Sequence, residues 1–153
     1  MFLLDRLLRL VRAAKLPLQM LWAAPVTVLC FVFYVLPCWA LGWYKYHGKL
    51  GNSWVWLHGN MPKWLREMWN YWDGQSVGNC IVLRQDPRSS PQALQMLVHE
   101  QEHTRQVMTW GPLQPIFYSL ASLALWMAGE DSYWTNPFEI AARRAAGQKI
   151  NVK

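Results

Sequence analysis

The sequence predicts a mainly helical α+β chain with a small β element, in which one compact domain follows an N-terminal helix and one apolar membrane segment. Three features support this: an uncharged run at 16–44, helix starts of the form cap-then-proline at Ser90-Pro91 and Asn136-Pro137, and one short apolar strand at 77–84. A length of 153 residues allows one domain. A hydrophobic content of 53% excludes disorder, and the single long apolar run excludes a multi-span transporter.

Residues 1–15 are predicted to form a basic amphipathic helix that lies in a membrane interface. Asp5, Arg9 and Arg12 fall on one stripe of the helix, and leucines fill the opposite side. Helices of this composition bind at the boundary between lipid headgroups and acyl chains. The alternative is the positively charged start of a signal sequence.

Residues 16–44 are predicted to form the membrane segment. These 29 residues carry no charge, and about 20 apolar residues suffice to span a bilayer as a helix. Trp22 and Trp43 stand 21 residues apart, roughly 31 Å along a helix, which matches the two interfaces of the hydrocarbon layer. Pro25 and Pro37 are expected to kink or split the helix. The alternatives are an unusually apolar core helix and a cleaved signal peptide, although no A-x-A site follows the run.

Residues 45–153 are predicted to form the compact domain. Its start, 45–60, is rich in Gly and Asn and indicates a loop. The elements expected after it are a short helix at 61–72, a strand at 77–84, a long helix at about 90–110, an apolar segment at 113–128 and a last helix at about 136–147. The three cysteines are odd in number and lack a C-x-x-C spacing, which indicates buried thiols rather than disulfides.

The helix at about 90–110 carries the pattern H-E-x-x-H, from His99 to His103. Two histidines four residues apart share one helix face, so both imidazoles can bind one ion, and zinc is the metal best known for this spacing. Glu100 follows the first histidine and can lie beside the metal without binding it, where it would act as general base for a zinc-activated water. The pattern therefore predicts Zn2+ as cofactor, His99 and His103 as ligands, and Glu100 as the catalytic residue.

A third ligand is predicted at Glu139, in the first turn of the helix at about 136–147. A glutamate on a second helix, packed against His99 and His103, would complete a His-His-Glu site that leaves one position open for water. The alternative is that Glu139 only interacts favourably with the dipole at the N-terminus of its helix.

These motifs resemble those of the gluzincin zinc metallopeptidases, in particular small bacterial members of that group. The shared pattern is H-E-x-x-H-x-x-Q from His99 to Gln106, a G-P turn at Gly111-Pro112, and N-P-x-E from Asn136 to Glu139. The resemblance covers about 74–147 and implies the same three zinc ligands and the same general base. The chain departs from the larger gluzincins at Arg143, where some of them have an acidic residue.

The resemblance also implies a substrate-binding strand, because in gluzincins the strand before the active helix binds an extended peptide along its edge. The residues in that position are Gly78, Asn79, Cys80, Ile81 and Val82. No motif marks the side chain that stabilises the transition state, and Tyr118, Tyr133, His47 and His58 are the candidates for it. His47 and His58 lie in Gly- and Asn-rich surroundings that indicate surface or interfacial histidines.

The apolar segment 113–128 constrains the topology. If it crossed a membrane, the two histidines would lie on one side and Glu139 on the other, so the three could not share an ion. At 16 residues it is also short for a span. We therefore expect this segment to pack on the motif helix or to lie against lipid.

The function predicted from the sequence is a membrane-associated zinc-dependent metallopeptidase that hydrolyses peptide bonds. One alternative is a non-catalytic membrane protein whose metal-stabilised gluzincin-like domain serves interaction or assembly. Another is an assembly subunit in which the H-E-x-x-H pattern is coincidental.

The expected partners are a peptide or protein substrate close to the membrane, and the lipid itself. Most positive charges flank apolar segments, which favours lipid headgroups, and no basic stripe with interleaved aromatics points to nucleic acid. The predicted location is the inner membrane of a bacterium. The distribution of Lys and Arg favours a cytoplasmic N-terminus.

Overall fold

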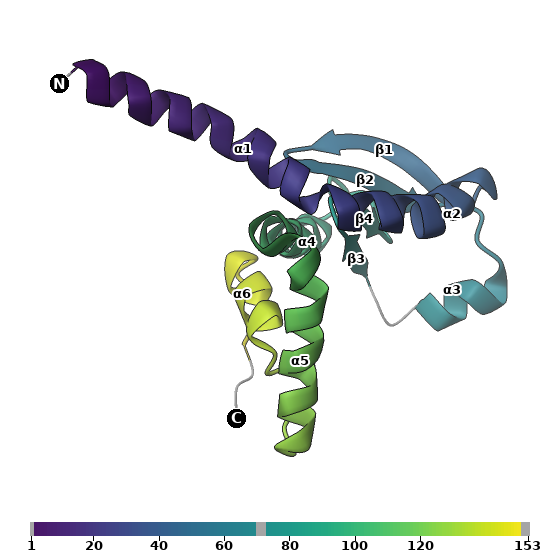
Figure 1. The fold of residues 1–153 in the computed structure, drawn as a ribbon. Helices are drawn as coiled ribbons and strands as arrows, with labels where there is room; N and C mark the ends of the chain where they lie inside the picture. The colour runs from purple at the N-terminus through teal and green to yellow at the C-terminus, as the bar shows by residue number, and fades with distance from the viewer. Residues whose placement is uncertain (1, 70–72, 151–153) are drawn as a thin grey trace.

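The computed structural model describes residues 2–69 and 73–150, and the side chains of 15–67 and 73–150 (Figure 1). The elements in chain order are α1 (Phe2–Cys30), a π-helical turn (Phe31–Val35), α2 (Leu36–Ala40), β1 (Tyr44–Leu50), β2 (Ser53–His58), α3 (Lys63–Trp69), β3 (Gly74–Val77), β4 (Cys80–Leu83), α4 (Pro91–Trp110), a short 3-10 turn (Gly111–Leu113), α5 (Gln114–Met127) and α6 (Pro137–Ala145). The fold is thus a mixture of α and β structure.

The core is a sheet that lies between two helical layers. Its strand order is β1-β2-β4-β3, with β2 and β4 parallel and the other neighbours antiparallel. On one face of the sheet Val82 packs with Val35, at the end of the π-helical turn that follows α1. On the other face Ile81 and Leu83 pack with Leu97 of α4. All four residues of β4 are buried because this central strand is covered on both faces, which explains its continuous apolar sequence.

Residues 2–40 form one continuous helical rod. α1 passes through Pro17 and Pro25, and the π-helical turn leads into α2. Pro37 has no N–H to donate, and the wider turn before it accommodates the missing hydrogen bond, so the expected split of the helix does not occur. Among the described residues, Lys15–Ala40 is the one helical stretch long and apolar enough to cross a membrane. The side chains that would make the predicted helix at 1–15 amphipathic lie outside the described ones.

α1 is docked on the rest of the chain through two glycines. A Cβ on Gly78 would lie 2.6 Å from the Cα of Thr27, and a Cβ on Gly111 would lie 2.4 Å from the Trp22 ring. Both glycines also have positive φ, at 66° and 55°. The backbone N–H of Asn79 donates to the Thr27 hydroxyl at 3.1 Å. The second half of α1, from about Met20 onward, is therefore part of the folded core, whereas its first half projects away from the rest of the chain (Figure 1).

The predicted loop at 45–60 is wrong, because these residues form the β1–β2 hairpin. Leu50 pairs with Ser53, so Gly51 and Asn52 form a two-residue turn. The register shifts at Gly48, where a bulge interrupts β1. The Gly and Asn residues that indicated a loop thus mark a turn and a bulge within a strand pair.

The predicted helices at 90–110 and 136–147 are confirmed as α4 and α6, with the expected caps. The Ser90 hydroxyl accepts from the N–H of Ala93 at 3.1 Å, and the Asn136 side chain accepts from the N–H of Phe138 at 2.9 Å. The helix predicted at 61–72 is present as α3, and its last three residues lie outside the described ones. The apolar segment at 113–128 forms α5, which runs away from the junction with α4 (Figure 1).

Candidate metal centre

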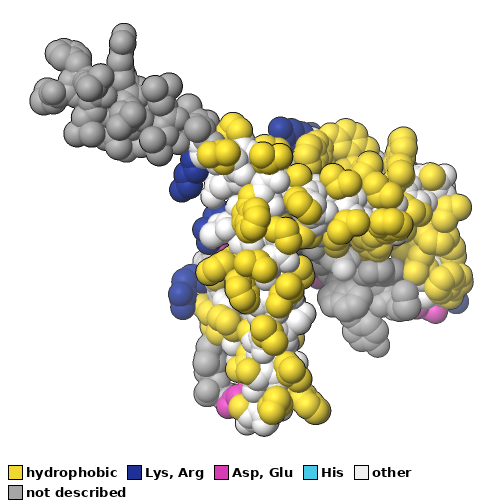
Figure 2. Space-filling view, viewed as in Figure 1, with side chains coloured by type: hydrophobic (Ala, Val, Ile, Leu, Met, Phe, Trp, Pro, Cys, Tyr) yellow, Lys and Arg dark blue, Asp and Glu magenta, His cyan; other side chains and the backbone are white. Residues whose placement is uncertain are grey.

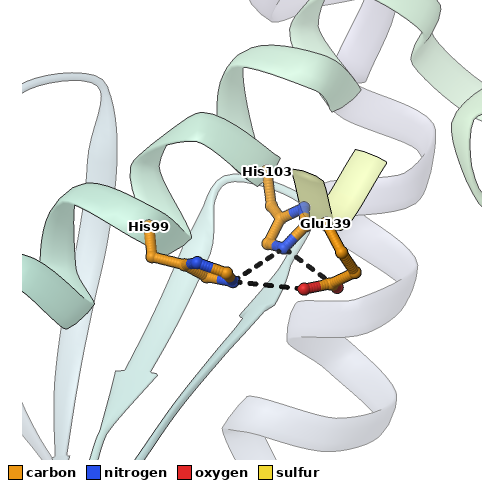
Figure 3. A group of neighbouring side chains, drawn as sticks. All are labelled: His99, His103 and Glu139. Carbon is orange, nitrogen blue, oxygen red and sulfur yellow. Dashed lines mark hydrogen bonds and ion pairs between the residues drawn. The ribbon is translucent and has the colours of Figure 1, made fainter. Parts of the chain in front are cut away.

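The two histidines of α4 and the glutamate of α6 point toward one another (Figure 3). The Nε2 atoms of His99 and His103 are 3.2 Å apart. Glu139 places one carboxylate oxygen 3.2 Å from His103 Nε2 and the other 3.4 Å from His99 Nε2. All three residues are buried, at 5%, 8% and 4% exposure. The structure thus brings together the three ligands predicted from the sequence as one group that could hold a metal ion.

The spacing of these donor atoms fits zinc. An ion about 2.1 Å from each of three ligand atoms, at tetrahedral angles, would hold those atoms about 3.4 Å apart. The two imidazole nitrogens are 3.2 Å apart, and each lies 3.2–3.4 Å from a different oxygen of the Glu139 carboxylate. Two imidazole nitrogens and one carboxylate are also a donor set that zinc accepts, with a fourth position left open.

Two glutamines set the tautomers of the histidines. The side-chain N–H of Gln106 donates to the carbonyl of Phe138 at 2.9 Å, which leaves its oxygen to accept from His103 Nδ1 at 2.9 Å. The side-chain oxygen of Gln148 lies 3.0 Å from His99 Nδ1. Because each Nδ1 donates a proton outward, each Nε2 can present a lone pair to a metal ion or, when the imidazole is protonated, donate a hydrogen bond to Glu139.

Two lone pairs that face each other at hydrogen-bond distance repel unless a cation lies between them. Burial alone would lower the pKa of His103, but the Glu139 hydrogen bond and the charges of Glu100 and Glu139 outweigh it and raise that pKa. A proton can therefore take the place of a metal ion at this position. The same histidines attract whichever cation is present.

Glu139 has two further partners that fix its carboxylate. The Tyr118 hydroxyl, from α5, donates to one oxygen at 3.0 Å, and the Arg143 guanidinium lies 3.5 Å from the other. Burial would raise the pKa of Glu139, but its hydrogen bonds with His103 and His99 outweigh burial and lower it. The carboxylate therefore stays ionised, as a zinc ligand requires.

Arg143, the position at which the sequence departs from the larger gluzincins, lies beside Glu139 in the structure. Its side chain is buried, donates to the carbonyl of Trp134 at 3.0 Å, and lies 4.1 Å from the Trp134 ring and 4.8 Å from the Tyr133 ring. The sequence indicated an unusual neighbour of Glu139, and the structure identifies it as a cation that helps to hold the carboxylate.

Glu100 lies beside the three donors without joining them. It is 4% exposed and packs against β3, where a Cβ on Gly74 would come within 3.0 Å of its carboxylate. Burial raises its pKa, the two histidines act in the opposite direction, and a backbone hydrogen bond from Ser76 also lowers it. The net effect is a raised pKa, which suits a group that accepts and releases a proton.

A cavity of about 390 Å³ adjoins the centre. Its wall includes His99, His103, Glu139 and Glu100, together with Tyr118 and Tyr133. The Tyr118 hydroxyl already donates to Glu139, so of the two tyrosines predicted as transition-state donors Tyr133 is better placed to serve a ligand in the cavity.

The strand beside the cavity is β3, not the one expected from the sequence. Cys80, Ile81 and Val82 lie in β4, which pairs with β2 on one side and β3 on the other, so they have no free edge. Gly78 and Asn79 form the turn between β3 and β4. Among the described residues no strand pairs with the outer edge of β3, and the whole of β3 lines the cavity. The predicted substrate edge is therefore one strand too late in the chain.

Two further histidines lie outside the centre, and the roles of two glutamines beside it were not predicted. His47 lies 3.9 Å from Asp86, and His58 stacks on Tyr44 at a ring distance of 5.9 Å, so both have partners outside the centre. Gln148 was missed because it follows α6 in a segment without a regular pattern. Gln106 belonged to the quoted motif, but its role in orienting His103 was not predicted.

Searches against protein families, curated proteins and solved structures found no match to this chain.

Proposed function

We propose that the chain is a membrane-associated zinc-dependent metallopeptidase. The observation that carries the proposal is the convergence of three buried donor groups: the imidazole nitrogens of His99 and His103 are 3.2 Å apart, close to the edge of a tetrahedral zinc site, and each lies 3.2–3.4 Å from one oxygen of Glu139. Glu100 beside these donors and the cavity that they line supply the other parts of a hydrolytic centre.

Each residue has a role in this proposal. Zinc, when bound, would act as a Lewis acid toward a peptide carbonyl and toward water. Glu100 would take a proton from the attacking water and pass it to the leaving amine, and its raised pKa favours both steps. Tyr133 would donate to the carbonyl oxygen as negative charge develops on it.

The peptide substrate would bind along β3. The outer edge of this strand borders the cavity, and an extended peptide can add to such an edge through main-chain hydrogen bonds. The bond to be cleaved would then lie between β3 and the side chains of α4, within reach of Glu100.

The location that we propose is the inner membrane of a bacterium, with the N-terminus in the cytoplasm. The apolar stretch Lys15–Ala40 supports membrane attachment, and the basic residues that precede it favour the anionic cytoplasmic leaflet.

A non-catalytic use of the same centre is the second candidate. Tyr118 of α5 donates to Glu139, and both histidines of α4 contact it, so the glutamate links α6 to its neighbours even before any ion binds. In this case zinc would hold α4 and α6 together without turnover.

The experiment that separates the two candidates is Glu100→Gln, measured as zinc content and as cleavage of a peptide library in detergent micelles. A peptidase keeps about one zinc per chain and loses cleavage by roughly 100-fold or more. The matched control is Glu102→Gln, because Glu102 is in the same motif but pairs with the exposed Arg105. A wild-type chain that binds zinc and cleaves no peptide would support the non-catalytic candidate.

A further inference from the structure

α5 has the reverse of the usual amphipathic arrangement, with polar side chains facing the protein and apolar side chains facing outward. Its inward positions are polar: Tyr118 donates to Glu139, and the Ser122 hydroxyl donates to the carbonyl of Ser132 at 3.0 Å and accepts from Asn136 at 2.8 Å. Its outward positions are Ile116, Leu120, Leu123 and Met127, which are 50–74% exposed. A helix that faces water has the opposite arrangement. The exposed side of α5 is therefore suited to an apolar surrounding.

The outward face of α1 has the same character. Leu18, Leu29 and Phe33 are 62%, 57% and 77% exposed, and no charged residue occurs from 16 to 44. The opposite face of the helix packs on the sheet and on α4 through residues such as Ala23 and Val35. This buried face accounts for only part of the apolar sequence of α1.

The exposed apolar side chains of the two helices cover one face of the molecule. Figure 2 shows them over α1 and down the length of α5, with Lys and Arg side chains at the margins. Figure 1 shows that the two helices run in different directions, so together they define a surface rather than a line. We call the outward residues of α1, of the π-helical turn and α2 that continue it, and of α5 the α1–α5 face.

We propose that the α1–α5 face lies on the surface of a lipid bilayer, with both helices parallel to the membrane plane, and that the metal centre takes as substrate an extended segment of a membrane-anchored protein. The second part rests on the function proposed above, whereas the first part does not.

Lipid fits this face better than a second copy of the chain does. Exposed tryptophans stand on it, among them Trp22, Trp39 and Trp126 at 48%, 52% and 68% exposure, and tryptophan is enriched where protein meets headgroups. The basic residues before and at the start of the apolar stretch, up to Lys15, complement anionic headgroups.

Packing on the domain argues for a helix in the membrane plane and against a helix that crosses it. The residues of α1 and its continuation that pack on α4 or on the sheet run from about 20 to 38, which is most of the apolar stretch. In a crossing helix, this part would lie in the hydrocarbon and would draw the sheet in with it. Lys45, Lys49 and Arg84 are exposed on that sheet, and its outer strands have open edges. Charges and unpaired strand edges are both strongly disfavoured in hydrocarbon.

The cavity of the metal centre lies between the two lipid-facing helices. Val26 and Cys30 of α1 line one side of it, and Pro115 and Ser119 of α5 line the other. Cys30 is next to the outward Leu29 in sequence, and Val26 is one turn away from it. Pro115 and Ser119 stand in the same relation to the outward Ile116. A segment that emerges from the bilayer beneath the α1–α5 face can therefore reach β3 and Glu100 directly.

The proposed position of the α1–α5 face on the bilayer, called its seating below, is tested with nitroxide labels on the full chain. The chain is bound to vesicles of phosphatidylethanolamine and phosphatidylglycerol. Labels are placed singly at Leu29→Cys, Leu123→Cys and Leu94→Cys, with the native cysteines replaced. Leu94 is the control, because it is 53% exposed but lies on α4. We expect the first two labels at similar shallow depth and the third in water. A label at Leu29 near the bilayer centre with Leu123 in water, or spin–spin broadening at Leu123 from a second copy, would overturn the seating.

The substrate class is tested with one peptide in two forms, soluble and fused to a transmembrane anchor in the same vesicles. We expect the anchored form to be cleaved at least 10-fold faster. The double variant Leu120→Ser, Leu123→Ser should lose this preference while it keeps its zinc, and Leu94→Ser should retain it. Equal cleavage of both forms by the wild type overturns the substrate class and leaves the proposed function intact. Cleavage of neither form overturns both, and the labels still decide the seating.

Discussion

Polar residues lie on the exposed side of α4 but on the inward side of its neighbour α5. α4 has polar residues such as Gln92, Arg105 and Thr109 on its exposed side, apart from the exposed Leu94 and Trp110. α5 has apolar residues on its exposed side and polar ones inside. The direction of amphipathicity is therefore reversed between these neighbours, as the proposed contact of α5 with lipid requires.

The inward faces of the two helices nevertheless meet at one residue. His99 and His103 reach Glu139 from α4, and Tyr118 reaches it from α5. A polar centre thus forms at the boundary between a water-facing helix and an apolar-facing one. Four predictions test how far this division extends.

The largest effect is expected where α4 supplies a ligand. His99→Ala should weaken zinc binding by about 100- to 1,000-fold, because a binding free energy of about 10–16 kcal/mol shared among four ligands assigns roughly 3–4 kcal/mol to each. Competition with a zinc-binding dye measures the change. Thr109→Ala, on the outward side of the same helix, is the control. Equal zinc affinity in both variants would contradict the assignment of the inward face.

The junction of the two helices provides the next test. Gly111→Ala combines a positive φ with overlap between the new Cβ and the Trp22 ring, and should lower the free energy of unfolding by about 2–4 kcal/mol. Gly129→Ala, beyond the other end of α5, has a φ of 75° but open space around the Cβ, and should cost only about 1 kcal/mol. Chemical denaturation in detergent measures both. Equal losses would mean that α1 is not docked at the junction.

Orienting residues on the two helices should have smaller and similar effects. Gln106→Ala frees His103 Nδ1, and Tyr118→Phe removes a hydrogen bond to Glu139. Each should weaken zinc binding by about 10- to 100-fold. A change in only one of the two variants, measured with the same dye, would show that only the helix concerned supports the centre.

The smallest effect is expected in the pH dependence of stability, which should have opposite signs with and without zinc. The pKa of His103 is raised above its ordinary value of 6.5, so its contribution to the stability of the metal-free chain is present below pH 6.5 and lost as pH rises through the raised pKa. Zinc binds the deprotonated imidazole, so its stabilising effect grows over the same window. Unfolding curves at pH 6 and pH 9, with zinc or with a chelator, measure both slopes. His103→Gln should abolish the difference between them.

The sequence was most informative where one physical cause sets the pattern. Cap-then-proline signals gave the starts of α4 and α6, and the histidine spacing together with Glu139 gave the three donors that the structure brings together. These features depend on local geometry, which a short stretch of sequence specifies.

Features that depend on distant contacts could not be predicted. The Gly and Asn residues of 45–60 indicate a loop, and no alternation of polar and apolar residues corrects this, because Val55 and Trp56 are buried on opposite faces of the sheet. The free edge at β3 depends on which strands pair, and Gln148 depends on how the chain returns past His99. In α5, the sequence shows apolar character but does not tell which side faces out.

Zinc K-edge X-ray absorption, with metal analysis of the same sample, tests the central claim most directly. The chain, purified after growth with zinc, should hold one zinc, with two imidazole nitrogens and one or more oxygens at about 2.0–2.2 Å. Zinc well below one per chain, or a sulfur neighbour at about 2.3 Å, would contradict a centre built from His99, His103 and Glu139.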